Sequence, residues 1–198
     1  MGGPVALELA CRCGGVQAEL AQDAVAAATH LKCYCKDCQA AARFLAYALP
    51  ENGGTELIHT TPDGLRIRVG GDRLAAFRLG PKGNCRWYAA CCNTPMFVTL
   101  PRRTLPFLGI IVEQGASDRV AAALGPVRGH AFTASAASTK DRPAKDQHIM
   151  GIGARIMMRM AGAFLSGKAA KNPFLTEASD WIVTPYVLTK DERRSATP

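Results

Sequence analysis

The order of apolar and polar residues predicts a series of short β-strands in the first half of the chain. The clearest is the segment 65–69, in which Leu65, Ile67 and Val69 alternate with two arginines, as in a strand with one buried face. Comparable segments predict strands at residues 5–9, 16–20, 74–79, 86–90, 97–100 and 108–112. A turn-forming loop at residues 80–84 separates two of them, so these strands are expected to pair as a hairpin.

Two alanine-rich segments of this half lack a strand pattern. Residues 24–28 are small and apolar and fit either a helix or a strand. Residues 40–48 have a helix-forming composition, and the proline, asparagine and glycines of residues 50–54 then predict a loop. The first half is therefore expected to be mainly β, with a short helical segment.

The second half of the chain is expected to be helical. Ser117 is expected to cap a short helix that ends at Gly125, and residues 133–147 are expected to form a loop. Residues 149–165 predict one long amphipathic helix. Its apolar stripe consists of Ile149, Ile152, Ile156, Met160 and Phe164.

The stripe of this helix is expected to be buried, with Arg155 and Arg159 on the opposite face. Packing on the sheet of the same chain is the main interpretation, and a homodimer contact or a membrane surface are the alternatives. Residues 181–188 predict a last strand and residues 190–198 a frayed terminus. The pattern predicts a β domain over residues 1–112 and an extension over residues 113–198 that packs on it, α+β overall.

Composition and charge exclude several classes of protein. The chain has 198 residues, of which 48% are hydrophobic and 20% charged, so it is expected to fold around a core. The chain contains no run of about 18 apolar residues, the length that would predict a membrane span. The N-terminus does not resemble a signal peptide, so a cytoplasmic location is expected. The net charge is +8, but the basic residues are scattered, so nucleic-acid binding is not expected.

The eight cysteines carry the strongest chemical signal. Without a secretory signal they are expected to stay reduced, which favours metal binding over disulfides. Cys33, Cys35 and Cys38 form the pattern C-x-C-x-x-C, so three thiolates from one turn are expected to bind one zinc ion. Three protein ligands leave a fourth tetrahedral position open, which is the arrangement of a catalytic zinc.

A second pair of cysteines predicts another metal site. Cys11 and Cys13 precede two glycines that permit a tight turn, and the other ligands are expected from the segment 86–95, which contains Cys91 and Cys92. Asn93 follows them and suits a left-handed turn position. Two zinc sites are therefore expected.

These motifs together resemble the glutathione-dependent formaldehyde-activating enzymes, whose domain also occurs in centromere protein V. The resemblance covers residues 5–112 and rests on C-x-C-G, then C-x-C-x-x-C, then an aromatic run that ends in a cysteine turn and proline. It implies a β-tent of small antiparallel sheets with one structural and one catalytic zinc. It assigns Cys33, Cys35 and Cys38 to the catalytic set, and Cys11, Cys13 and Cys92 to the structural set.

The chain departs from the family pattern at two places. Ala89 stands where the closing C-x-x-C motif has its first cysteine, so either Cys91 or Cys85 is expected to be the fourth structural ligand, with Cys91 preferred because it shares the turn. After the catalytic trio, Gln39 and alanines replace the Ser/Thr-Gly pair of the family. The second departure argues against glutathione itself as the substrate.

The function that the resemblance implies is that of a carbon–sulfur lyase, which forms S-hydroxymethylglutathione from glutathione and formaldehyde. The substrate is expected to be a small thiol or its aldehyde adduct, and its anionic groups require cations. Lys32, Lys36, Arg43 and Arg86 are close in sequence to the ligands, and Lys36 and Arg43 are expected at the cleft. The alternative is a non-catalytic binding module in which zinc only holds the fold.

Overall fold

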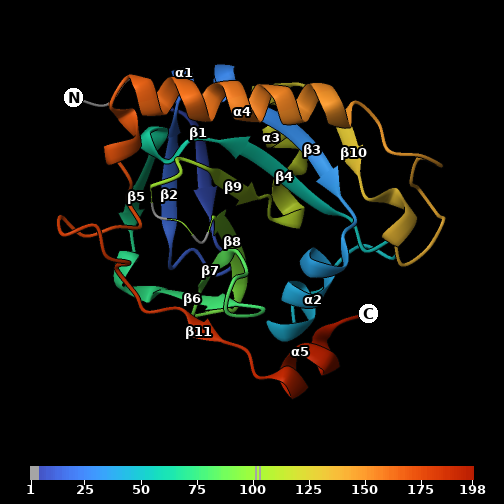
Figure 1. The fold of residues 1–198 in the computed structure, drawn as a ribbon. Helices are drawn as coiled ribbons and strands as arrows, with labels where there is room; N and C mark the ends of the chain where they lie inside the picture. The colour runs from blue at the N-terminus through green and yellow to red at the C-terminus, as the bar shows by residue number, and fades with distance from the viewer. Residues whose placement is uncertain (1–4, 101, 103) are drawn as a thin grey trace.

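The computed structural model describes residues 5–100, 102 and 104–198, which form two β-sheets and five α-helices (Figure 1). The smaller sheet is antiparallel and has the order β1-β2-β5. The larger sheet has eight strands in the order β10-β3-β4-β9-β8-β7-β6-β11, and its six inner strands are antiparallel neighbours. The prediction of a mainly β fold with a helical C-terminal part is confirmed.

The strands of the smaller sheet are β1 (Val5–Ala10), β2 (Gln17–Ala21) and β5 (Leu65–Val69). Those of the larger sheet are β3 (Thr29–Cys33), β4 (Thr55–Thr60), β6 (Leu74–Arg78), β7 (Cys85–Ala89), β8 (Thr94–Thr99), β9 (Leu108–Ile111), β10 (Gly129–Ala131) and β11 (Tyr186–Val187). The helices are α1 (Gln22–Ala27), α2 (Lys36–Phe44), α3 (Ser117–Leu124), α4 (Ile149–Leu165) and α5 (Lys190–Ala196). Single 3₁₀ turns are η1 (Pro62–Gly64), η2 (Gly71–Arg73), η3 (Gln114–Ala116), η4 (Thr133–Ser135) and η5 (Lys168–Ala170).

The strands β3 and β4 are absent from the sequence-based prediction. Both have a neighbouring strand on each side and are largely buried on both faces, so they lack the alternation of apolar and polar residues that marks a half-buried strand. The ambiguous segment 24–28 is mostly the helix α1, and the predicted strand 181–188 is reduced to two residues in β11.

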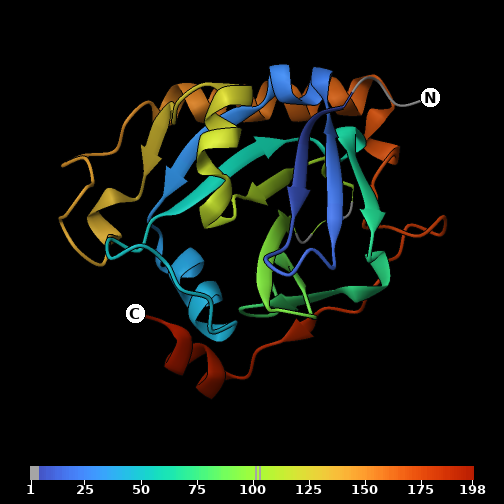
Figure 2. The ribbon, with the colours of Figure 1, turned by 180° about the vertical axis from the view of Figure 1, so that it is seen from behind.

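The main core lies between the two sheets, where β1 and β2 stand in front of the larger sheet (Figure 2). Its centre is an aromatic cluster in which the Trp87 and Phe174 ring centroids are 4.7 Å apart and those of Phe97 and Phe174 are 5.4 Å apart. The Trp87 indole N–H donates a 3.1 Å hydrogen bond to Thr99 Oγ1, which satisfies its buried polar group. Phe174 belongs to the C-terminal extension, so the extension completes the core of the β domain.

The last residues are helical, which corrects the prediction of a frayed terminus. Thr189 and Glu192 form a reciprocal capping box at the start of α5. Arg193 fixes the helix to the rest of the chain through a 2.8 Å ion pair with Asp37 of α2 and a 3.1 Å hydrogen bond to the Leu79 carbonyl. The long-range contacts, which sequence propensity cannot reveal, hold α5 against α2.

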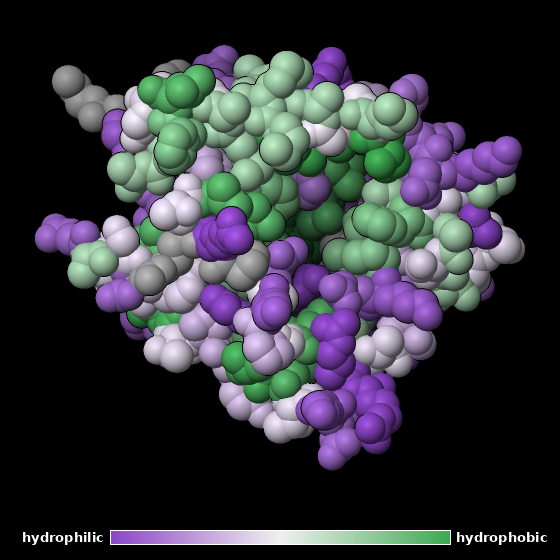
Figure 3. Space-filling model, viewed as in Figure 1, coloured by the Kyte–Doolittle hydropathy of each residue, from purple (hydrophilic) through white to green (hydrophobic). Residues whose placement is uncertain are grey.

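Helix α4 lies along one side of the molecule and packs on β3, β4 and β10 (Figures 1 and 3). Ile152 of the predicted stripe is buried, and Ile156 and Met160 are half-buried. Ile149 and Phe164, by contrast, are exposed. No helix of the described residues is long and apolar enough to cross a membrane.

The prediction for Arg159 is wrong, because its side chain lies on the inner face of α4. Its guanidinium donates a 2.7 Å hydrogen bond to Thr29 Oγ1 and a 2.6 Å hydrogen bond to the His59 carbonyl. These two acceptors compensate the cost of partly burying the Arg159 guanidinium, which the spacing of the apolar stripe predicts to lie on the exposed face. The inner face is therefore narrower than predicted, and part of the apolar stripe points to solvent.

Candidate metal centres and the adjoining cavity

Four cysteine sulfurs meet where the β1–β2 turn approaches the β7–β8 turn. The Sγ atoms of Cys11, Cys13, Cys91 and Cys92 all lie within 4.8 Å of one another. Cys13 and Cys91 are 3.2 Å apart, Cys11 and Cys13 3.6 Å, and Cys11 and Cys91 3.9 Å. Zinc binds thiolates at about 2.3 Å, so the sulfurs of a tetrahedral site are about 3.8 Å apart. The donor set and its spacing fit a closed four-thiolate zinc site.

The turn between β1 and β2 is shaped by the approach of these sulfurs. Gly14 adopts a positive φ of 72°, which an L-residue with a side chain disfavours. A Cβ on Gly15 would lie 3.0 Å from Arg73 Nη1, 3.1 Å from Cys91 Sγ and 3.3 Å from Cys13 Sγ, so a side chain here would crowd both sulfurs. The Val16 N–H donates a 3.2 Å hydrogen bond to Cys11 Sγ, which holds this sulfur in place within the turn.

The β7–β8 turn presents Cys91 and Cys92 on the same side. Asn93 has a φ of 55°, which confirms its predicted left-handed conformation and bends the chain after the two cysteines. Burial raises the pKa of Cys92, but hydrogen bonds to Thr94 and nearby backbone N–H groups outweigh it and lower the pKa to about 6. Cys85 lies in β7 and is buried outside the group, so of the two candidate fourth ligands the structure places Cys91 with the others.

Three further sulfurs meet at the junction of β3 and α2. The Sγ atoms of Cys33, Cys35 and Cys38 all lie within 4.8 Å of one another, and those of Cys33 and Cys38 are 3.9 Å apart. Within the described part of the chain, no other His, Cys, Asp or Glu joins this group. Cys35 is the N-cap of α2 and accepts a hydrogen bond from the Cys38 N–H, so the helix N-terminus also favours a thiolate there. The donors fit a zinc ion with three protein ligands.

The three thiols cannot all ionise easily by themselves. Hydrogen bonds from Cys33 and Cys38 lower the pKa of Cys35 to about 2, and hydrogen bonding to Cys35 raises the pKa of Cys33. For Cys38 the hydrogen bond to Cys33 lowers the pKa, but the hydrogen bond with Cys35 and burial outweigh it and raise the pKa to about 11. A divalent cation would remove this competition, because thiolates on a metal are deprotonated outright.

Backbone contacts fix the loop that carries these cysteines. The Gln39 amide donates hydrogen bonds of 2.7 Å to the Tyr34 carbonyl and 2.8 Å to the Ser135 carbonyl. The Tyr34 N–H in turn donates a 2.9 Å hydrogen bond to the carbonyl of Ala131 in β10. The C-terminal extension therefore positions the cysteine loop as well as the core.

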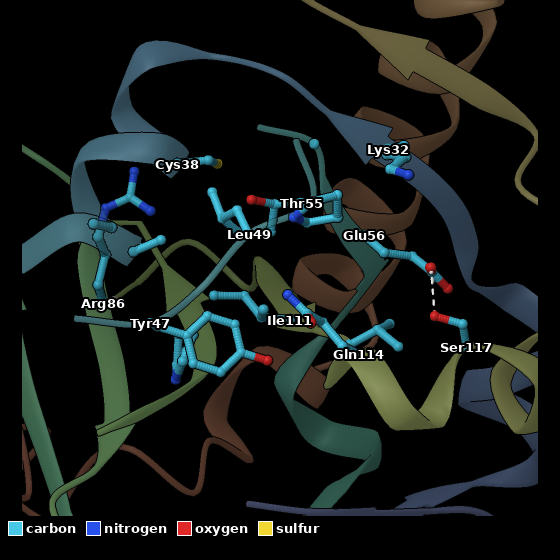
Figure 4. Close-up of a pocket in the computed structure, with 16 residues that line it drawn as sticks. Lys32, Cys38, Tyr47, Leu49, Thr55, Glu56, Arg86, Ile111, Gln114 and Ser117 are labelled. Atoms are coloured by element: carbon cyan, nitrogen blue, oxygen red, sulfur yellow. Dashed lines mark hydrogen bonds between the residues drawn. The ribbon is translucent and has the colours of Figure 1, made fainter. Parts of the chain in front are cut away.

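A cavity of about 200 Å³ opens beside Cys38 (Figure 4). Arg86 lies next to Cys38 at one end, and Lys32 and Glu56 lie at the other, with Tyr47 and Gln114 along the wall. Arg86 is only 6% exposed and has no carboxylate within ion-pair distance among the described residues. Its positive charge contributes to the lowered pKa of Cys35 and partly offsets the rise in the pKa of Cys38.

Glu56 is held in the cavity wall by two hydrogen bonds. His30 Nε2 lies 2.8 Å from Glu56 Oε1, and Ser117 Oγ donates a 2.9 Å hydrogen bond to Glu56 Oε2. The hydrogen bond from His30 is the main reason that the pKa of Glu56 is lowered. Burial lowers the pKa of His30, but the hydrogen bonds to Glu56 and to the Gly125 carbonyl outweigh burial, so the pKa is raised overall. The pair keeps a carboxylate ionised at the cavity.

The cations at the cavity differ from those expected. Lys36 and Arg43 are exposed and are not among the residues that line it, whereas Lys32 and Arg86 are. Lys36 precedes Cys38 by two residues, which corresponds to about 200° around a helix, so its side chain points away from the cluster. Sequence reasoning also missed Glu56, because its strand β4 was missed and no local motif marks it.

Comparisons with known proteins give the family of the chain. A crystal structure of a Rhodobacter sphaeroides protein, from a structural genomics target, is similar with 20% identity and a TM-score of 0.41; the match covers 64% of this chain and all of that chain. No curated protein sequence matches the chain. Residues 4–181 match a family of unknown function, DUF6151, and the chain belongs to this family.

Proposed function

We propose that this protein binds two zinc ions and catalyses the making or breaking of a carbon–sulfur bond between a small thiol and an aldehyde. Cys11, Cys13, Cys91 and Cys92 hold the structural ion, and Cys33, Cys35 and Cys38 hold the catalytic one. The observation that carries the proposal is the three-sulfur group without a fourth protein donor among the described residues, beside a cavity with charged walls.

The charges of the cavity suit a glutathione-like thiol. Such a molecule carries two carboxylates and one ammonium group, and the cavity offers the cations Lys32 and Arg86 together with the carboxylate of Glu56. Arg86 at the Cys38 end and Lys32 at the other end can each bind a carboxylate, while Glu56 can accept hydrogen bonds from the ammonium group. This pattern of charges supports a zwitterionic thiol over a purely anionic or apolar one.

The proposed reaction adds the thiol to the carbonyl group of formaldehyde. The thiol loses its proton, its sulfur attacks the carbonyl carbon to form the carbon–sulfur bond, and the carbonyl oxygen receives a proton and becomes a hydroxyl group. Zinc supplies Lewis acidity and stabilises thiolate sulfur at neutral pH. The side chains of Arg86, Lys32 and Glu56 hold and orient the thiol so that its sulfur lies at the Cys38 end of the cavity.

The test is the exchange between formaldehyde and its glutathione adduct, followed by NMR with and without protein. Wild type should accelerate exchange, Cys35→Ser should not, and Arg86→Gln should weaken glutathione binding. Lys36→Gln is the control for Arg86→Gln, because Lys36 is a cation of α2 close to the cysteines that does not line the cavity. Wild-type exchange no faster than that of Cys35→Ser would contradict the proposal.

Metal analysis of the same samples distinguishes the proposed enzyme from a non-catalytic binding module. A binding module would bind zinc at one or both clusters but leave the exchange rate at that of buffer. Metal content measured beside the NMR assay therefore separates a wrong substrate class from a wrong metal assignment.

A further inference from the structure

Helix α4 is apolar on both faces, although only one face is covered. Its inner face, with Ile152 and Ala163, packs on the sheet. The outer face carries Met150 and Leu165, which are 90% and 85% exposed, and three further large side chains that are more than half exposed. These three are Met157, Met158 and Phe164. A helix that is apolar all round is normally covered on all sides.

The outer apolar residues form one continuous surface. Residues 150, 154, 157, 161 and 165 recur at the three- and four-residue spacing that places side chains on one face of a helix. Figure 3 shows the resulting apolar band along α4 across one side of the molecule. We call the exposed side chains of Met150, Met157, Met158, Phe164 and Leu165 the outer apolar face.

The segment that carries this face has positive but no negative side chains. Residues 147–176 contain no aspartate or glutamate, but they contain two arginines and two lysines. Arg155, Lys168 and Lys171 are exposed. A shallow groove beside the N-terminal half of α4 is lined by Arg128, Arg155 and His148 and adds a concave basic surface.

We propose that the outer apolar face of α4 binds to the surface of a membrane that contains anionic lipids. The methionines, Phe164 and Leu165 would enter the boundary between headgroups and acyl chains, while Arg155, Lys168 and the basic groove contact lipid phosphates. The helix would lie in the plane of the membrane, because α4 is too short and its inner face too firmly packed on β3 and β4 for it to span. This inference is independent of the proposed catalytic function.

Charge favours a lipid surface over a second copy of the chain. A symmetric dimer through this face would bring the two copies of Arg155 and Lys168 toward one another. The segment 147–176 offers no carboxylate to compensate them. An anionic membrane compensates these cations and covers the apolar side chains at the same time.

The test is co-sedimentation of the full chain with vesicles at low and high salt. Wild type should bind vesicles of equal parts phosphatidylglycerol and phosphatidylcholine, and should bind vesicles of phosphatidylcholine alone much less. The double variant Met157→Glu/Leu165→Glu should bind at least tenfold more weakly. Arg155→Gln and Lys168→Gln should each weaken vesicle binding about fivefold. High salt should also weaken the binding of wild type.

Matched controls come from β11 and from the loop between β6 and β7, elements that lie on the other side of the molecule from α4 (Figure 1). Val187→Glu in β11 places an acid at another exposed apolar position, and Lys82→Gln removes another exposed cation. Both should bind vesicles as wild type does, and all variants should keep the wild-type circular dichroism and melting temperature because the changed side chains are exposed.

Three results would overturn the inference. One is absence of binding to the anionic vesicles. Another is equal binding by Met157→Glu/Leu165→Glu and Val187→Glu. The third is a wild-type dimer in sedimentation velocity that Met157→Glu/Leu165→Glu converts to a monomer, without vesicle binding, since the outer apolar face would then be a contact between copies.

Discussion

The two cysteine clusters are built from the chain in opposite ways. The four-sulfur cluster joins turns that are about 80 residues apart and belong to different sheets, with Cys11 and Cys13 after β1 and Cys91 and Cys92 after β7. The three-sulfur cluster takes all its ligands from six consecutive residues at the start of α2. A site that crosses the fold stabilises it, whereas a local site can give up its fourth position to a substrate.

The largest expected effect is the loss of the cross-sheet site. Cys13→Ser should give unfolded or insoluble protein, because a structural zinc contributes about 10 kcal/mol to folding, which is comparable to the whole stability of a domain. The measurement is soluble yield and thermal unfolding. Cys85→Ala is the control, because Cys85 is a buried cysteine outside both clusters and should cost only about 1–3 kcal/mol. A soluble Cys13→Ser protein with wild-type melting would remove the basis of the comparison.

The local site should behave differently. Cys35→Ser should remain folded with a melting temperature close to that of wild type, since the other cluster still joins the two sheets. It should lose one zinc per chain in elemental analysis and all acceleration of thiol–aldehyde exchange. Unfolding of this variant to the extent expected for Cys13→Ser would show that both sites are structural.

The ion pair that supports the cavity gives a pH-dependent effect of intermediate size. Because the pKa of His30 is raised above its ordinary value of 6.5, its contribution to stability is complete below pH 6.5 and is lost as pH rises through the folded-state pKa. Glu56, whose pKa is lowered from 4.5, loses its contribution only as pH falls through its folded-state value. The pair is therefore most stabilising between about pH 4.5 and 6.5.

His30→Gln should lower the free energy of unfolding by about 1.5–3 kcal/mol near pH 6, the usual range for a hydrogen bond to a charged group. The loss should be smaller at pH 9, because the contribution of a raised pKa to stability is lost as pH rises through the folded-state pKa. Urea unfolding at the two pH values measures it. An equal loss at both would show that His30 acts by packing alone.

The smallest effect concerns the cations at the cavity. Lys32→Gln should raise the KM for glutathione about fivefold and leave kcat nearly unchanged, because an exposed ion pair contributes at most about 1 kcal/mol. Lys36→Gln should change neither constant. Equal effects of the two substitutions would mean that the net charge of this region matters, not the position of the side chain in the cavity.

Much of the fold and of the clusters could be predicted from the sequence, and the failures have physical reasons. Strand β5 alternates because one face is exposed, and C-x-C-x-x-C places its ligands by spacing alone. By contrast, β3 and β4 are covered on both faces, α5 depends on Arg193 contacts more than 100 residues away, and Lys36 was chosen by distance along the chain although the helix turns it outward. These features depend on packing between residues that are far apart in the sequence, which the local pattern of apolar and polar residues does not reveal.

Zinc K-edge absorption on the purified protein tests the central claim most directly. The account predicts two zinc ions per chain with an average of about 3.5 sulfur ligands each, because one ion has four cysteine ligands and the other three. Glutathione should raise the average toward four, and Cys35→Ser should leave a single ion with four sulfur ligands. One zinc per wild-type chain, or four sulfur ligands on both ions before any thiol is added, would contradict the assignment of an open site at Cys33, Cys35 and Cys38.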